Sequence, residues 1–167
     1  MTCAIIKMLM LRELRALRRE IEGYPDESLL WAQPDGVSNT AGNLALHLSG
    51  NLQHFVGAKL GGTGYVRDRD AEFARRDVGR AEILREIDAA SAAVAQTFDR
   101  VGDDVLSAPF PEPIMQKTIT TDVWLMHLVA HLGYHLGQID YHRRMVTGDK
   151  TTVDVVSVRE LPALPAS

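Results

Sequence analysis

Cysteine is almost absent from the 167-residue chain, which contains only Cys3. A single cysteine cannot form an internal disulfide, and its place beside the N-terminus makes it a poor candidate for a catalytic nucleophile. We therefore expect a reducing, cytoplasmic setting.

Basic charge is also scarce, since 18 Lys and Arg stand against 22 Asp and Glu and give a formal net charge of −4. Nucleic-acid binders normally carry a basic patch, so the charge balance argues against that class.

Long apolar runs are missing as well. No run approaches the ~18 uninterrupted apolar residues that a membrane-spanning helix requires, and we expect no membrane partner.

Two metal-enzyme signatures are absent from the sequence. Leu132 occupies the position of the glutamate in the zinc-peptidase pattern H-E-x-x-H. The paired E-x-x-H motifs of di-iron bundles do not occur. These absences argue against a peptidase and against di-iron oxygen chemistry.

Four long helices are predicted from apolar residues that recur every three to four positions. Prolines in the stretch 106–117 exclude a long helix there, so the connections differ in length. We expect an all-α fold, a four-helix bundle with long crossover loops over residues 1–148, and a C-terminal tail over residues 149–167. The tail contains a β-prone run, 153–158. The predicted helices cover residues 3–22, about 38–59, 80–101 and 121–147.

Two charged segments need an interpretation. The first predicted helix carries a run of mixed charges, and we expect a solvated face, with an anion site as the alternative. The run consists of Arg12, Glu13, Arg15, Arg18, Arg19, Glu20 and Glu22. A charged, glycine-punctuated loop is expected over residues 61–79. Long loops in compact domains are often functional, so this loop could cover the mouth of a site and offer an arginine to a carboxylate substrate, with a purely solvated loop as the alternative.

Histidines recur at intervals of four in the last helix, at His127, His131 and His135. Residues four apart lie one turn apart on the same helix face, with roughly 6 Å between Cβ atoms, so two imidazoles can converge on one ion. Buried imidazoles without partners would cost free energy, and a shared metal ion is the economical explanation. We expect His131 and His135 to be ligands, while His127 could be a fourth ligand, a supporting group or a histidine at the bundle edge.

A third ligand has to come from another helix, and we expect it to be His47. On the second predicted helix, Asn43, His47 and Asn51 follow one another at intervals of four, which places polar groups on a face that should be buried. Three imidazoles leave one coordination position open, as catalytic metal sites do. Asn51 and Gln138 are candidates for orienting the ligands or a substrate by hydrogen bonds, with polar helix packing as the alternative.

These motifs resemble the DinB-like superfamily of bacterial metal-binding four-helix bundles. The resemblance covers about residues 3–147 and rests on the second-helix histidine and on the run His127-Leu-Val-Ala-His131-Leu-Gly-Tyr-His135-Leu-Gly-Gln138. It implies one divalent metal, usually zinc or nickel, held by His47, His131 and His135. It also implies a homodimer.

Characterised members of that family include low-molecular-weight-thiol transferases and a thiol-dependent isomerase. The resemblance therefore implies a metal-dependent thiol S-transferase or related detoxification enzyme, with a small thiol as co-substrate in the open metal position and a small-molecule electrophile as its partner. Two alternatives stay open. One is a metal-dependent hydrolase, which needs a general base, and the other is a non-enzymatic, metal-binding stress-response protein whose site stays capped.

Overall fold

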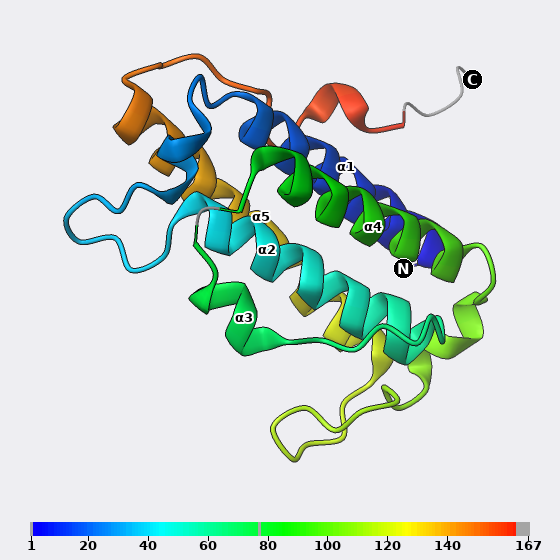
Figure 1. The fold of residues 1–167 in the computed structure, drawn as a ribbon. Helices are drawn as coiled ribbons and strands as arrows, with labels where there is room; N and C mark the ends of the chain where they lie inside the picture. Colours follow the sequence, from blue (N-terminus) through cyan, green and yellow to red (C-terminus); the bar gives the residue numbers. More distant parts are fainter. Residues whose placement is uncertain (1, 77, 163–167) are drawn as a thin grey trace, which may run out of the picture.

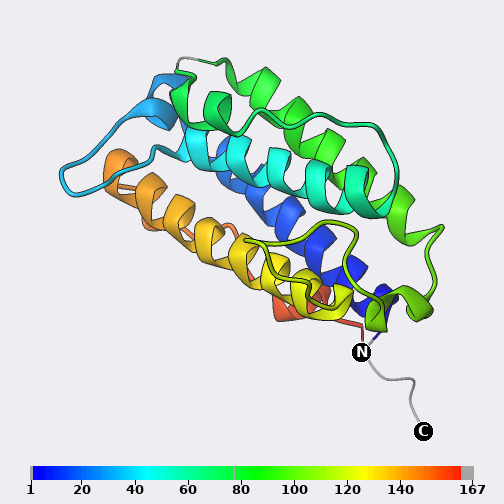
Figure 2. The ribbon, with the colours of Figure 1, turned by 90° about the horizontal axis from the view of Figure 1, so that it is seen from below.

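The computed structural model describes residues 2–76 and 78–162 and contains the predicted four-helix bundle (Figure 1). Its long helices are α1 (Cys3–Glu22), α2 (Ala41–Leu52), α4 (Arg80–Phe98) and α5 (Thr121–Thr147). Helices α1 and α2 each pack against both α4 and α5, an arrangement that is visible from below in Figure 2. No strand forms in the described ranges. The predicted all-α class is confirmed.

The ends of the long helices follow from local sequence. The Thr2 hydroxyl accepts a hydrogen bond from the Ile5 N–H at the start of α1, and Thr40 accepts one from the Asn43 N–H at the start of α2. Such N-cap bonds satisfy donors that have no partner within the helix. Gly148 ends α5 in the left-handed conformation, with φ +72°, which glycine adopts without a steric penalty.

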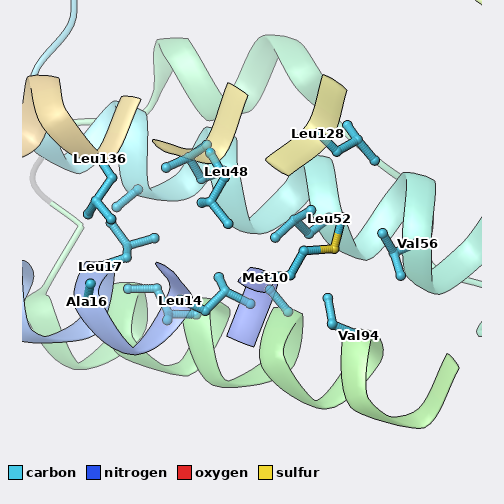
Figure 3. Close-up of a cluster of buried hydrophobic side chains, with 14 of the residues drawn as sticks. Met10, Leu14, Ala16, Leu17, Leu48, Leu52, Val56, Val94, Leu128 and Leu136 are labelled. Atoms are coloured by element: carbon cyan, nitrogen blue, oxygen red, sulfur yellow. The ribbon is translucent and has the colours of Figure 1, made fainter. Parts of the chain in front are cut away.

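The core fills the space between the four long helices (Figure 3). Leucines of α2 and α5 meet apolar side chains of α1 and α4 there, and most of them are fully buried. In the described part of the chain, no helix is both long enough and apolar enough to cross a membrane. The residues labelled in Figure 3 are Met10, Leu14, Ala16, Leu17, Leu48, Leu52, Val56, Val94, Leu128 and Leu136.

Two elements near α2 differ from the expected pattern. The second helix does continue to about residue 60, but beyond α2 it widens into a π-helix, η2 (Gln53–Leu60). The charged loop contains a short helix, α3 (Arg69–Ala74), that packs against α2. The Asp68 side chain caps α3 by accepting from the Ala71 N–H, a start signal that the sequence analysis did not use.

Two connections and the tail each hold a 3₁₀ helix. These helices are η1 (Glu27–Trp31) between α1 and α2, η3 (Asp103–Ser107) between α4 and α5, and η4 (Val158–Glu160) after α5. The β-prone run of the tail forms no strand. Within that run Asp154 and Val156 have positive φ values of 61° and 56°, which lie far from the extended region that a strand needs.

The expectation of a wholly solvated charged face on α1 is wrong. Arg12, Glu13 and Glu20 are buried. Glu20 accepts a 2.6 Å hydrogen bond from Nε of Arg143 on α5, and both side chains are almost fully covered. Because α1 packs against two neighbouring helices, its buried surface is wider than the single apolar stripe from which the prediction was made.

Candidate metal centre

The three histidines predicted as ligands come together where α2 faces α5. His47 is buried on α2, whereas His131 and His135 are half-buried, one turn apart on α5. One ring nitrogen of each lies within 4.8 Å of a ring nitrogen of the other two. His47 Nε2 and His131 Nε2 are 3.3 Å apart. Donor atoms at this spacing could hold a metal ion.

Glu72 determines which nitrogen of His47 faces the shared space. Its Oε2 lies 2.9 Å from His47 Nδ1, and since a carboxylate only accepts hydrogen bonds, Nδ1 carries the proton. The lone pair of His47 is then on Nε2, the nitrogen that points at His131. Arg67 Nη2 also lies 3.2 Å from Nδ1, but two donors do not hydrogen-bond, so we interpret this approach as packing.

Arg67 holds the Glu72 carboxylate by both oxygens. Arg67 Nε donates to Oε1 at 2.7 Å, and Nη2 donates to Oε2 at 2.8 Å. Burial acts to raise the pKa of Glu72, but the hydrogen bonds from His47 and Arg67 outweigh it and the pKa lies below the ordinary value. An ionised carboxylate that accepts from a ligand imidazole is a common support in metal sites, because it fixes the tautomer and the orientation of the ring.

His135 is oriented in the same way from the other side of the cluster. Its Nδ1 lies 2.6 Å from Oε1 of Gln138, one turn further along α5. An amide oxygen accepts, so Nδ1 carries the proton and Nε2 keeps its lone pair. Gln138 itself is exposed. Both His47 and His135 therefore keep an unprotonated Nε2, as metal binding requires.

The surroundings keep the two α5 imidazoles, His131 and His135, neutral. Burial, together with the smaller effects of the neighbouring His135 and His47 rings, lowers the pKa of His131 to about 4. Burial also lowers the pKa of His135, against the opposing effect of the Gln138 hydrogen bond. A neutral imidazole is the form that binds a metal, so neither ring has to lose a proton at neutral pH before it can act as a ligand.

Local packing explains how Glu72 reaches the cluster. Asn43 Nδ2 donates to the Glu72 carbonyl oxygen at 2.9 Å and to the Arg75 carbonyl oxygen at 3.1 Å, which ties α3 to α2. At Gly50, an added Cβ would lie 2.2 Å from Glu72 Oε1. A side chain at position 50 would therefore have to displace the carboxylate from its place against α2.

Comparison with known families gives the family of the chain. A family model described as the DinB superfamily matches residues 10–139. The chain belongs to the DinB superfamily. The match includes His47, His131, His135 and Glu72. Searches of the curated proteins and of the solved structures found no significant match.

His127 stands apart from the cluster of this DinB-superfamily chain. It is exposed and stacks on Trp124, with ring centroids 4.8 Å apart and an interplanar angle of 11°. Its ring centroid lies 6.1 Å from that of His131. Among the described residues, the group that could share one ion comprises His47, His131 and His135 without it. The structure thus places His127 at the edge of the bundle.

The two remaining histidines have other partners. His142 is buried, with Nδ1 2.8 Å from the Tyr24 hydroxyl and Nε2 2.8 Å from the Ala32 carbonyl oxygen. His54 lies 3.5 Å from a carboxylate oxygen of Glu112. These contacts are structural and lie outside the cluster.

Of the two amides considered as supporting groups, Gln138 contacts a histidine and Asn51 does not. Asn51 is buried on α2, and in the described part of the chain no hydrogen bond joins it to the three histidines. Sequence analysis missed Glu72 and Arg67 as supports for His47. The available signal was the pair of charges within the loop, but nothing in their spacing shows that this loop folds back onto α2.

Proposed function

We propose that this protein binds one divalent ion, zinc or nickel, through His47, His131 and His135, and that the ion activates a small thiol for transfer to an electrophile. The observation that carries the proposal is the convergence of three imidazole nitrogens within 4.8 Å. Imidazole suits both zinc and nickel. The hydrogen bonds from His47 to Glu72 and from His135 to Gln138 support it, because they leave the Nε2 atoms free for the ion.

Three protein ligands leave a coordination position for a substrate. His131 and His135 are half-buried rather than sealed, which favours an exchangeable position over a capped storage site. An ion held by His47, His131 and His135 would supply the positive charge that favours the thiolate form of a bound thiol. In the transfer, the thiolate sulfur forms a bond to an electrophilic carbon, the leaving group departs with its bonding electrons, and the thiol proton passes to solvent.

Hydrolysis is less well supported, because two carboxylates that could act as a general base, Glu72 and Asp140, are already engaged by other groups. Glu72 is the nearest carboxylate, but it is held by Arg67 on both oxygens and by His47. Asp140 pairs with Arg144 at 2.9 Å. Among the described residues, neither carboxylate is free to take a proton from a nucleophilic water.

Two measurements on zinc-loaded protein test the proposal. Thermal unfolding with a thiol at 100 times its dissociation constant should show about 2.7 kcal/mol of added stability. Conjugation of that thiol to monobromobimane, followed by fluorescence, should be faster with zinc-loaded protein than with metal-free protein.

The matched control is His54→Ala, a histidine outside the cluster, which should behave like the wild type in both assays. A His131→Ala, His135→Ala variant should lose both effects. Conjugation at the same rate with and without bound metal, together with no thermal shift from any small thiol tried, would exclude the transferase.

A further inference from the structure

A cavity of about 240 Å³ lies between the connection that precedes α2 and the C-terminal half of α5. The two segments lie side by side in Figure 2, where the connection is light blue and this end of α5 is orange. A cavity of about 150 Å³ is enough for benzene, whereas pockets for drug-sized molecules start at about 300 Å³. The size therefore suits a molecule of one or two rings.

Hydrogen bonds within the protein hold the two sides of this cavity in place. Nε2 of the buried His142 lies 2.8 Å from the Ala32 carbonyl oxygen, which ties the connection to α5. Gln33 Nε2 donates to the carbonyl oxygens of Val37 and Ser38 at 3.0 and 3.3 Å, which closes the loop. A ligand would therefore not have to order this loop, and its affinity would not be reduced by that cost.

The buried part of the lining is uncharged. Leu44 and His142 both line the cavity and are both 3% exposed. A carbonyl only accepts, so Nε2 of His142 donates to Ala32 and Nδ1 accepts from the Tyr24 hydroxyl at 2.8 Å. Burial lowers the pKa of His142, against the opposing effect of the Ala32 hydrogen bond. With both nitrogens engaged, His142 offers a ligand the surface of a neutral ring.

Tyr141 and Met145 form an exposed edge of the lining. They are 70% and 54% exposed and lie one turn apart on α5, so a ligand can enter from solvent past them. An aromatic ring and a thioether both pack favourably against another flat ring. This edge therefore favours an aromatic ligand.

The polar part of the lining consists of the neutral side chains Ser38, Asn39 and Gln138. Within the described ranges, the Ser38 hydroxyl and the Asn39 amide have no protein partner, and Gln138 uses only Oε1, for His135. These groups can donate to or accept from a ligand. None of the described lining residues carries a charge, so a charged ligand would lose hydration without gaining an ion pair.

We propose that this cavity is a second ligand site, separate from the histidine cluster, for a neutral planar molecule of one or two rings with an amide or hydroxyl group. The ring packs against His142, Leu44 and Tyr141, and the polar group bonds with Asn39 and the NH₂ of Gln138. Of the described residues in the lining, none is a candidate metal ligand. The site therefore needs no metal ion and does not depend on the proposed transferase.

Benzamide, benzoate and benzamidine test the proposal, because they share one shape and are neutral, negative and positive. Each is titrated into zinc-loaded wild type and into the His131→Ala, His135→Ala variant, and ¹H–¹⁵N correlation spectra follow binding. Benzamide should shift the amide signals of residues 36–39 and 138–145 and bind both proteins with the same affinity. The charged probes should bind about tenfold or more weakly, because an unpaired buried charge costs more than a buried amide.

Tyr141→Ala removes the aromatic edge at an exposed position and should weaken benzamide binding about fivefold. Tyr134→Ala is the matched control. It removes a 65% exposed tyrosine of α5 that does not line the cavity, and it should bind benzamide like the wild type. Equal losses in the two tyrosine variants would overturn the assignment of the site.

Three other results would also overturn the proposal. Charged probes that bind as tightly as benzamide would refute the neutral ligand class. Loss of benzamide binding in the double-histidine variant would place the probe at the histidine cluster. Absence of benzamide binding to the wild type would refute the site itself. Each of these results leaves the zinc content of the wild type, and so the metal proposal, to be judged separately.

Discussion

Replacing Gly50 by alanine should weaken metal binding without removing any ligand. The new Cβ would lie 2.2 Å from Glu72 Oε1 and 3.0 Å from Glu72 Cδ, both too close for unbonded atoms. The carboxylate is the movable end of its side chain, so we expect it to shift away from α2. The clashing oxygen, Oε1, accepts from Arg67 Nε, and the other oxygen, Oε2, lies 2.9 Å from His47 Nδ1. Because the two oxygens move together, we expect the bond to His47 to lengthen, which weakens the contact that fixes the tautomer of His47.

The expected magnitude follows from the role of such supporting carboxylates. Their loss typically weakens metal affinity 10- to 100-fold, or about 1.4–2.8 kcal/mol. Folding stability should change less, because alanine in a helix interior is favoured over glycine by about 0.5–1 kcal/mol and this gain offsets part of the strain. Gly50→Ala should therefore be a folded protein with a selective defect in metal binding.

Competition with a chromophoric zinc chelator measures the dissociation constant, and urea unfolding of the metal-free protein measures the stability. Gly133→Ala is the matched control, since its Cβ meets nothing within 4 Å, and it should bind zinc like the wild type. Glu72→Gln keeps the size of the side chain but removes its charge, and it should weaken zinc binding in the same direction. Wild-type zinc affinity in folded Gly50→Ala and in Glu72→Gln would refute the role given to Glu72.

Three predictions concern stability. Burial raises the pKa of Glu20 from an ordinary 4.5 to about 7, so the folding stability linked to its protonation is fully present below pH 4.5 and is lost as the pH rises through 7. In urea unfolding from pH 5 to 8, the wild type should lose stability relative to Glu20→Gln, by at most about 1.4 kcal/mol per pH unit. Parallel stability profiles of the two proteins would contradict this. Arg143→Met should cost about 3–5 kcal/mol at pH 8 by leaving the Glu20 carboxylate buried alone, and adding Glu20→Gln should recover part of the loss; a single variant as stable as the wild type would refute the buried pair. Gly42→Ala would place a Cβ 2.6 Å from the Trp31 ring, and overpacking of about 1–3 kcal/mol should lower the unfolding midpoint, whereas an unchanged or higher midpoint would show that the ring moves freely.

The helices and the three histidines could be predicted because they depend on local periodicity. The four-residue interval between His131 and His135 places both on one face of any helix. His47 was found because it interrupts a helix face that should be apolar. These inferences need only the chain's own helical repeat and the expectation that a bundle brings inward faces together.

Glu72 could not be predicted, because its place depends on contacts between distant parts of the chain. It belongs to a short helix whose attachment to α2 depends on Asn43 and on the missing side chain of Gly50. Likewise, Glu20 looks like a surface residue in the sequence, and only the position of Arg143 on α5 accounts for its burial. Hydrogen-bond partners on other elements leave no periodic trace in the sequence.

Metal content is the most direct test of the metal site. Protein purified without a histidine tag should be analysed for zinc and nickel by mass spectrometry, beside the His131→Ala, His135→Ala variant. We predict about one equivalent of zinc or nickel in the wild type and almost none in the variant. Wild-type protein that is metal-free and stays so after incubation with zinc and with nickel would contradict the metal site and the function built on it.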